Sequence, residues 1–208
     1  MHDADVGPAG GCTVTARAWM EQGTAVFLTA VARLADDELG KPTALPGWTR
    51  RHVIAHVHYN AEALRRLVRW AQTGEPAPMY RDRAQRAAEI ESGARLPAAR
   101  LRTLVHDSAA ALAAEFDGLQ QAALTREVTT AQGRTIPASE IAWLRTREVA
   151  VHAVDLGAGV NFADLPGDLN TALVSDVVAR RCAAGEAAPL AAWLTGRASG
   201  APVLGPWL

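Results

Sequence analysis

Between Thr49 and Gln72 the apolar residues follow the period of an α-helix, and no other feature of the chain limits its fold so strongly. They recur every three or four positions and form one stripe made of Val53, Val57, Ala61, Leu64, Leu67, Val68 and Ala71. Thr49 is a suitable N-cap, and Gly74 stands where such a helix commonly ends. An amphipathic helix of this length must bury its stripe, so we expect it to pack against other helices.

Further helices are predicted on both sides of this segment, because Ala and Leu are frequent there and are strong helix formers. They run over Thr13–Asp37, Pro97–Leu119, Ala138–Gly157 and Pro166–Ala184. Neither an alternating strand pattern nor an internal repeat is evident in the sequence. We therefore predict an all-α protein, a bundle of four main helices with a short C-terminal extension.

These patterns divide the chain into two parts. Residues 1–160 contain the predicted bundle, and residues 161–208 contain a short helix and a glycine-rich tail from Leu190 to Leu208. Within the first part, the segment from Arg81 to Ser92 is polar and is expected to be exposed. The first nine or so residues, with their glycines and proline, are expected to form a loose arm.

Composition limits the possible partners and compartment. The 21 basic and 22 acidic residues nearly balance, so no large field attracts nucleic acid or an anionic membrane. No apolar run approaches the roughly 20 residues that span a bilayer, and Met1 to Val6 does not resemble a signal peptide. Cys12 and Cys182 are too few for a disulfide framework, and no C-x-x-C motif offers a thiolate zinc site. We therefore expect a cytoplasmic protein with neither nucleic-acid nor membrane partners.

Histidines accompany the apolar stripe of the most periodic helix. His52, His56 and Asn60 are spaced four apart and therefore share one side of it. His56 stands next to Val53 and Val57, so it is predicted to point into the bundle, whereas His52 is interpreted as a surface or supporting residue. A buried imidazole is costly unless it is paired or bound to a metal.

The later helix carries a matching pair. Glu148 and His152 are also four apart, and Asp155 follows three residues later. Together with His56 they would offer two imidazoles and a carboxylate, which suit a divalent ion such as zinc and leave one position open. Asp155 could orient one imidazole. Spacing alone leaves alternatives open, namely a solvated Glu–His pair and a half-buried core histidine at position 56.

Two long segments resemble a known family. They read LPGWTRRHVIAHVHYNAEALRRLVRWAQTGEPAPMY from Leu45 to Tyr80 and TAQGRTIPASEIAWLRTREVAVHAVDL from Thr130 to Leu156. Both resemble the mycothiol-dependent maleylpyruvate isomerases, which are members of the wider DinB-like superfamily. This resemblance implies an up-down-down-up four-helix bundle with its metal near one end.

The same resemblance implies a set of functional residues. By position it assigns the metal ligands to His56, Glu148 and His152, and catalytic arginines to Arg86 and Arg197. The implied cofactors are a divalent metal, with zinc expected, and the thiol mycothiol. The implied substrate is a small dicarboxylate, whose carboxylates the planar guanidinium groups would hold.

The activity implied by the resemblance is the cis–trans isomerisation of maleylpyruvate to fumarylpyruvate, in aromatic compound degradation through gentisate. A thiolate would add to the double bond, the resulting single bond would rotate, and elimination would release the product. The chain has a shorter C-terminal part than is usual in this family, so two alternatives stay open: a mycothiol S-transferase and a non-catalytic metal-binding bundle. Trp48 and Trp143 are interpreted as packing residues, with Trp143 able to border the pocket.

Overall fold

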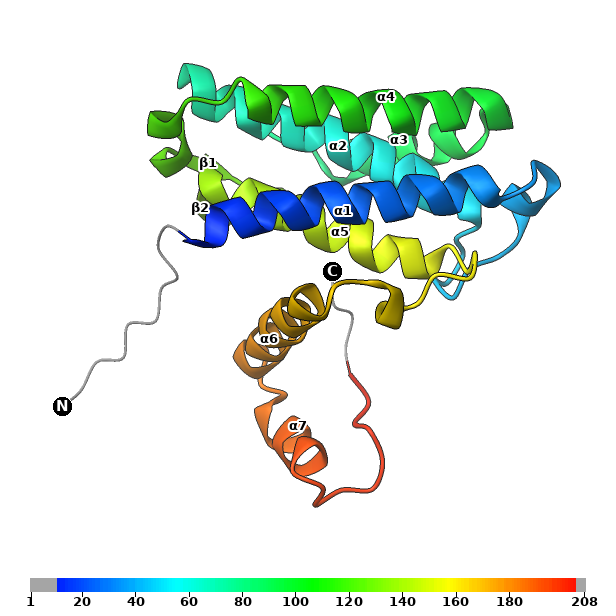
Figure 1. Ribbon diagram of the computed structural model, residues 1–208, viewed down its shortest axis with the longest axis vertical. Coiled ribbons are helices and arrows are strands. Elements are labelled where there is room, and N and C mark those ends of the chain that lie inside the picture. The colour runs from blue at the N-terminus through cyan, green and yellow to red at the C-terminus, as the bar shows by residue number, and fades with distance from the viewer. Residues whose placement is uncertain (1–10, 205–208) are drawn as a thin grey trace. The chain divides into compact units, whose positions relative to one another are not determined.

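The computed structural model describes residues 11–204, with side chains from residue 15 onward, and this part of the chain is mostly helical (Figure 1). The helices are α1 (Gly11–Arg33), α2 (Arg50–Thr73), α3 (Arg83–Ala94), α4 (Ala98–Asp117), α5 (Ile141–Asp155), α6 (Gly167–Ala183) and α7 (Ala187–Leu194). The chain divides into two compact units, and the first ends at Asn161 and the second begins at Phe162. None of the described helices is both long enough and apolar enough to cross a membrane.

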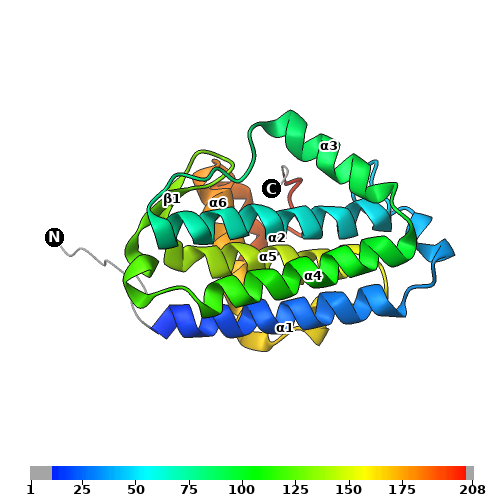
Figure 2. The same cartoon turned by 90° about the horizontal axis from the view of Figure 1, so that it is seen from above.

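The first unit is a bundle of α1, α2, α4 and α5, in which α1 packs mainly on α5 and α4 mainly on α2. The starts of α2 and α4 lie together, because Arg51 Nη1 donates to the Leu96 carbonyl at 2.7 Å. The start of α2 meets the end of α5, where Arg50 Nε donates to the Leu156 carbonyl at 2.7 Å. Hence α2 and α4 run one way, and α1 and α5 run the other (Figure 2). This is the predicted up-down-down-up order.

Helix α2 begins and ends as its sequence predicts. At its start, the Thr49 backbone N–H donates to His52 Nδ1 at 3.1 Å, as part of a capping box. At its end, Gly74 adopts the left-handed conformation, with a φ of 83°, and its N–H donates to the Trp70 carbonyl. Both ends of α2 are therefore defined by local hydrogen bonds, and its apolar stripe is free to pack on the neighbouring helices.

Most of the polar segment after α2 is exposed, as predicted, but it also forms a helix that the sequence pattern did not predict. Asp82 caps a helix there, since its Oδ1 accepts from the Gln85 backbone N–H at 2.7 Å, and α3 follows. Gly93 of α3 approaches α2 so closely that a Cβ at this position would lie 2.8 Å from the Cβ of Ala55. With Ile90 also buried, α3 packs on α2 and carries the chain back to the start of α4.

A short hairpin joins α4 to α5, which the sequence pattern did not predict. Its strands are β1 (Glu127–Thr129) and β2 (Thr135–Pro137), which pair antiparallel with Val128 opposite Ile136. Both of these side chains are buried on the end of the bundle. Strands of three residues are too short to show an alternating pattern, so only the turn around Gly133, with a φ of 80°, has a sequence signal.

The second unit contains α6 and α7. Its buried apolar residues, within the described part of the chain, include Leu169, Leu173 and Leu190. Val174 and Trp193 are 61% and 40% exposed, so this unit has a much smaller apolar core than the bundle. The predicted tail thus begins within a helix, α7, rather than as irregular chain.

Candidate metal centre

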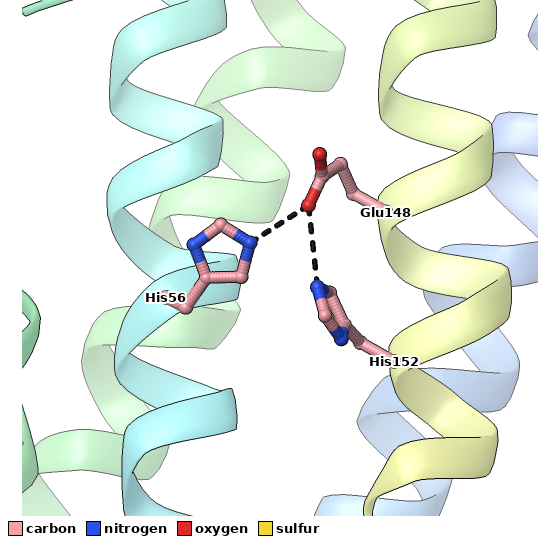
Figure 3. A group of neighbouring side chains, drawn as sticks. All are labelled: His56, Glu148 and His152. Atoms are coloured by element: carbon pink, nitrogen blue, oxygen red, sulfur yellow. Dashed lines mark hydrogen bonds and ion pairs between the residues drawn. The ribbon is translucent and has the colours of Figure 1, made fainter. Parts of the chain in front are cut away.

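Three side chains from two helices face one another inside the first unit (Figure 3). His56 of α2 and Glu148 of α5 lie closest, with 2.7 Å between Nε2 and Oε2. His152, one turn further along α5, places its Nε2 3.4 Å from the same Glu148 oxygen. One ligand atom from each of the three lies within 4.8 Å of the others. The structure therefore brings together the three residues that the sequence predicts as metal ligands.

The fit of these residues to a metal rests on their burial and donor atoms. His56 and His152 are 3% and 6% exposed, and the Glu148 side chain is 14% exposed. Two imidazole nitrogens and a carboxylate oxygen are the donor set of many catalytic zinc sites, which keep a position open for a reactant. Burying three titratable groups together is costly without such a partner. The residues present therefore suit a divalent ion.

Charge in the cluster is distributed unevenly. Burial would raise the pKa of Glu148, but the neighbouring His56 and His152 outweigh it and hold this pKa well below its usual range. Burial lowers the pKa of His56. Burial also acts to lower the pKa of His152, yet its hydrogen bonds to Asp155 and Glu148 prevail and raise it to about 9. Without a metal, a protonated His152 therefore balances an ionised Glu148 at neutral pH.

Asp155 orients one of the imidazoles. Its Oδ2 lies 2.8 Å from His152 Nδ1, one turn beyond the centre on α5. A carboxylate in this position keeps a proton on Nδ1, so the proton that His152 gives up on binding a metal is the one on Nε2. Asp155 thus takes the supporting position that its spacing predicts.

Arg86 of α3 reaches the other imidazole. Its Nη2 lies 3.3 Å from His56 Nδ1, and because a guanidinium only donates, Nδ1 is the acceptor in this contact. Tyr80 lies beside Arg86, and burial raises the pKa of its hydroxyl to about 12. The structure therefore brings Arg86 to the centre, together with the half-buried phenol of Tyr80, which no sequence pattern singled out.

Arg197 belongs to the second unit, beyond Asn161. Its guanidinium donates to the Thr195 carbonyl, and the residue is exposed. Its catalytic role stays a prediction.

Aromatic residues divide into those that contact the cluster and those that do not. Trp48 packs its ring 5.4 Å from that of His56 and 6.5 Å from that of His152, between centroids. Trp48 is thus a packing residue, as interpreted, but one that covers the candidate centre. Trp143 instead packs 6.0 Å from Trp19. His52 is engaged in the N-cap of α2 and is not one of the three clustered ligands.

A second buried polar contact lies one turn from the centre on both helices. Arg145 is 1% exposed, and its Nη1 donates to the Val57 carbonyl and to Asn60 Oδ1, each at 2.8 Å. Helical spacing predicts Asn60 on the inner side of α2, but Arg145 was not predicted as a buried residue. The available signal was its position three residues before Glu148, which puts the two side chains on one face of α5.

Comparison with known proteins gives a consistent result. The family model for the mycothiol maleylpyruvate isomerase N-terminal domain matches residues 20–157. A crystal structure of the mycothiol-dependent maleylpyruvate isomerase is 41% identical, covers 80% of this chain and 69% of that chain, and has a TM-score of 0.77. A histidine-to-alanine mutant of such an isomerase is 40% identical, with the same coverage and TM-score. No protein among the curated sequences matches the chain.

A more distant structure is informative about the fold alone. YfiT from Bacillus subtilis, described as a four-helix bundle of unusual topology, is 17% identical, covers 75% of this chain and 91% of that chain, and has a TM-score of 0.58. The bundle and its clustered side chains define a class of protein, the four-helix bundles with a candidate metal centre. Within that class, the chain belongs to the family of the mycothiol maleylpyruvate isomerase N-terminal domain. The predicted family and the predicted all-α fold are confirmed.

Proposed function

We propose that the chain is a metal- and thiol-dependent isomerase that converts maleylpyruvate to fumarylpyruvate, with a divalent ion, zinc, held by His56, Glu148 and His152. The observation that carries the proposal is the convergence of three buried ligand atoms from two helices within 4.8 Å. The identity of 41% to a mycothiol-dependent maleylpyruvate isomerase supports the thiol and the substrate. The chain itself is an enzyme of the isomerase class.

The bound ion would supply Lewis acidity, lowering the pKa of a thiol at its open position so that a thiolate is available at neutral pH. Together the ion and the thiol would supply the nucleophilic chemistry that allows the double bond of the substrate to rotate, with His56, Glu148 and His152 holding the ion. The nucleophile in this scheme comes from mycothiol.

The role of Arg86 follows from which nitrogen of the His56 imidazole carries the proton. Nδ1 of His56 accepts from Arg86, so the imidazole proton is on Nε2, facing Glu148. For Nε2 to serve as a ligand, that proton must move to Nδ1, which then donates and no longer accepts from Arg86. The guanidinium would become free to bind a substrate carboxylate beside the centre, with the Tyr80 hydroxyl next to it.

The deciding experiment measures metal content and product together. Purified protein is expected to hold about one divalent ion per chain, and to convert maleylpyruvate to fumarylpyruvate only when mycothiol is added. His56→Ala is expected to lose both the metal and the activity. Full metal occupancy in that variant would contradict the ligand assignment.

A mycothiol S-transferase is the second candidate. The chain covers 69% of the isomerase structure, and its second unit is small, so the part of the site beyond the bundle can differ. A transferase would share the metal and the thiol but would release a thiol conjugate. Mass spectrometry of products would separate the two functions, because an isomerase leaves mycothiol unchanged whereas a transferase consumes it.

A further inference from the structure

A cavity of about 220 Å³ lies between α1 and α4, on a different side of the bundle core from the candidate metal centre. Its walls are mostly apolar or small side chains, including Met20, Leu28, Ala109, Ala110, Leu112 and Ala113. Thr24 adds a hydroxyl, and the exposed Glu21 and His106 and the buried Arg145 of α5 complete the lining. None of the three clustered ligands lines this cavity, so it is a separate feature of the molecule.

Arg145 is a buried cation with unused donors. Within the part of the chain that the structure describes, its hydrogen bonds all come from Nη1, and its buried Nε has no partner. No carboxylate in that part lies within ion-pair distance of it. A guanidinium carries five N–H donors, so the bonds to Val57 and Asn60 leave several unfilled. Burial lowers the pKa of Arg145 to about 10, so the side chain is still charged at neutral pH.

The carboxylates nearest this charge are already engaged elsewhere. Glu148, three residues along α5, attracts Arg145 electrostatically, but its Oε2 faces His56 and His152. Glu21 lines the cavity and is paired with Arg17 at 2.6 Å. A buried charge without a close counter-charge carries an uncompensated desolvation cost, and an unsatisfied buried donor commonly marks the place of an unseen ion or water.

We propose that this cavity is a binding site for a small carboxylate anion, held by Arg145. A planar guanidinium matches the two oxygens of a carboxylate, which can accept from Nε and the adjacent terminal nitrogen together. The cavity is smaller than the roughly 300–1,000 Å³ of ordinary small-molecule sites, which favours an anion of few heavy atoms. The apolar walls suit a short hydrocarbon tail. This site depends neither on the metal nor on the isomerase reaction.

The test is a fluorine NMR titration of the full chain with trifluoroacetate, at constant ionic strength. A saturable shift is expected for the unaltered protein, and Arg145→Met is expected to weaken binding by roughly tenfold or more. Arg65→Met is the matched control, because Arg65 is a part-buried arginine that lines a different groove and is already paired with Glu62 and Glu115. It is expected to bind the probe as the unaltered protein does.

A second variant keeps the test decisive if Arg145→Met does not fold. Ala110→Leu changes an exposed residue of α4, fills the cavity from its wall and leaves Arg145 in place. It is expected to weaken probe binding by a similar factor. Unchanged binding in Ala110→Leu would overturn the proposal. Displacement of the probe by an equal concentration of chloride would overturn the proposal that the site selects carboxylates. Chloride is a single atom and lacks the two oxygens that match the planar guanidinium.

Discussion

Two buried polar clusters lie about one helical turn apart between α2 and α5. One has the ligand atoms for a cation, and the other has hydrogen-bond donors without acceptors. His56, Glu148 and His152 direct their metal-ligating atoms at a common point. Arg145 and Asn60, one turn along each helix, hold a guanidinium with more donors than the bundle satisfies. The first cluster suits a cation and the second an anion. The same two helices can therefore present opposite binding properties, depending only on which residues occupy successive turns.

Apolar packing on both sides holds these polar layers in place. One core cluster contains Val53, Val57, Val149 and Ala153, which surround the candidate metal centre along α2 and α5. The other contains Ala61, Leu64, Ile141 and Leu144, beyond the layer of Arg145. Close-packed interiors resist changes of even one methylene. The polar side chains are therefore arranged in advance of any ligand, which is what a specific binding site needs.

The largest effect is expected when the first cluster loses its charge. Glu148→Gln keeps the size of the side chain but removes its anionic oxygen. Altering a residue that only supports a metal ligand lowers metal affinity by about 10–100-fold. Glu148 is itself a proposed ligand, so we expect Glu148→Gln to lower metal affinity by roughly 1,000-fold. Competition with a chromogenic chelator measures the metal affinity of each protein. Glu62→Gln, a carboxylate on α2 that pairs with Arg65, is the control, and equal affinities in the two variants would refute the centre.

The second cluster is tested through stability. Arg145→Met leaves the Val57 carbonyl and Asn60 Oδ1 without their donor, and is expected to lower the free energy of unfolding by about 2–4 kcal/mol. Adding Asn60→Leu removes one orphaned acceptor, so the double variant should recover about 1 kcal/mol. Urea denaturation of the unaltered protein, the two single variants and the double variant measures the coupling free energy between Arg145 and Asn60. Strictly additive losses would show that the Arg145–Asn60 bond contributes nothing.

A change of pH separates the clusters further, because only the first exchanges protons near neutrality. The pKa of His152 is raised to about 9 in the folded protein, above the roughly 6.5 of a free imidazole. Its contribution to the stability of the metal-free protein is therefore complete below about pH 6.5 and is lost as pH rises through 9. Metal binding needs the neutral form, so affinity should rise about tenfold per pH unit from 7 to 9 and then level off.

Calorimetry in two buffers of different ionisation enthalpy checks this pH dependence. About one proton is expected to leave for each metal bound at pH 7. In Asp155→Asn the hydrogen bond that raises the pKa of His152 is weakened, so the plateau should begin at a lower pH. Heats that do not depend on the buffer would mean that no group at the centre releases a proton.

Helical periodicity and residue chemistry predicted much of the bundle and its candidate centre. The stripe of α2 and the spacing of Glu148 and His152 define helix faces directly, and the resemblance supplied the pairing of α2 with α5. Such patterns work where a helix has one apolar face and few exceptions. The long helices and the three converging ligands could therefore be predicted from the amino-acid sequence alone.

Other features depend on tertiary contacts that no local pattern records. Helix α3 was missed because its sequence is largely polar, and its packing relies on Ile90 and on the close approach of Gly93 to α2. The hairpin was missed because its strands have three residues each. Arg145 was missed because an arginine is mostly exposed by default, and only the surrounding helices bury it.

The smallest expected effect concerns His52, which lies one turn before His56 on α2, whereas Asn60 lies one turn after it. His52 Nδ1 accepts from the Thr49 backbone N–H at the start of α2, so it completes a helix cap rather than a binding cluster. His52→Ala is expected to lower the free energy of unfolding by about 1 kcal/mol, and to leave metal content and affinity unchanged. Thermal denaturation and metal analysis of this variant, beside His56→Ala, would measure both. A loss of metal in His52→Ala would mean that the cation-binding cluster extends over three turns of α2, and that the contrast between neighbouring turns is less sharp than the structure indicates.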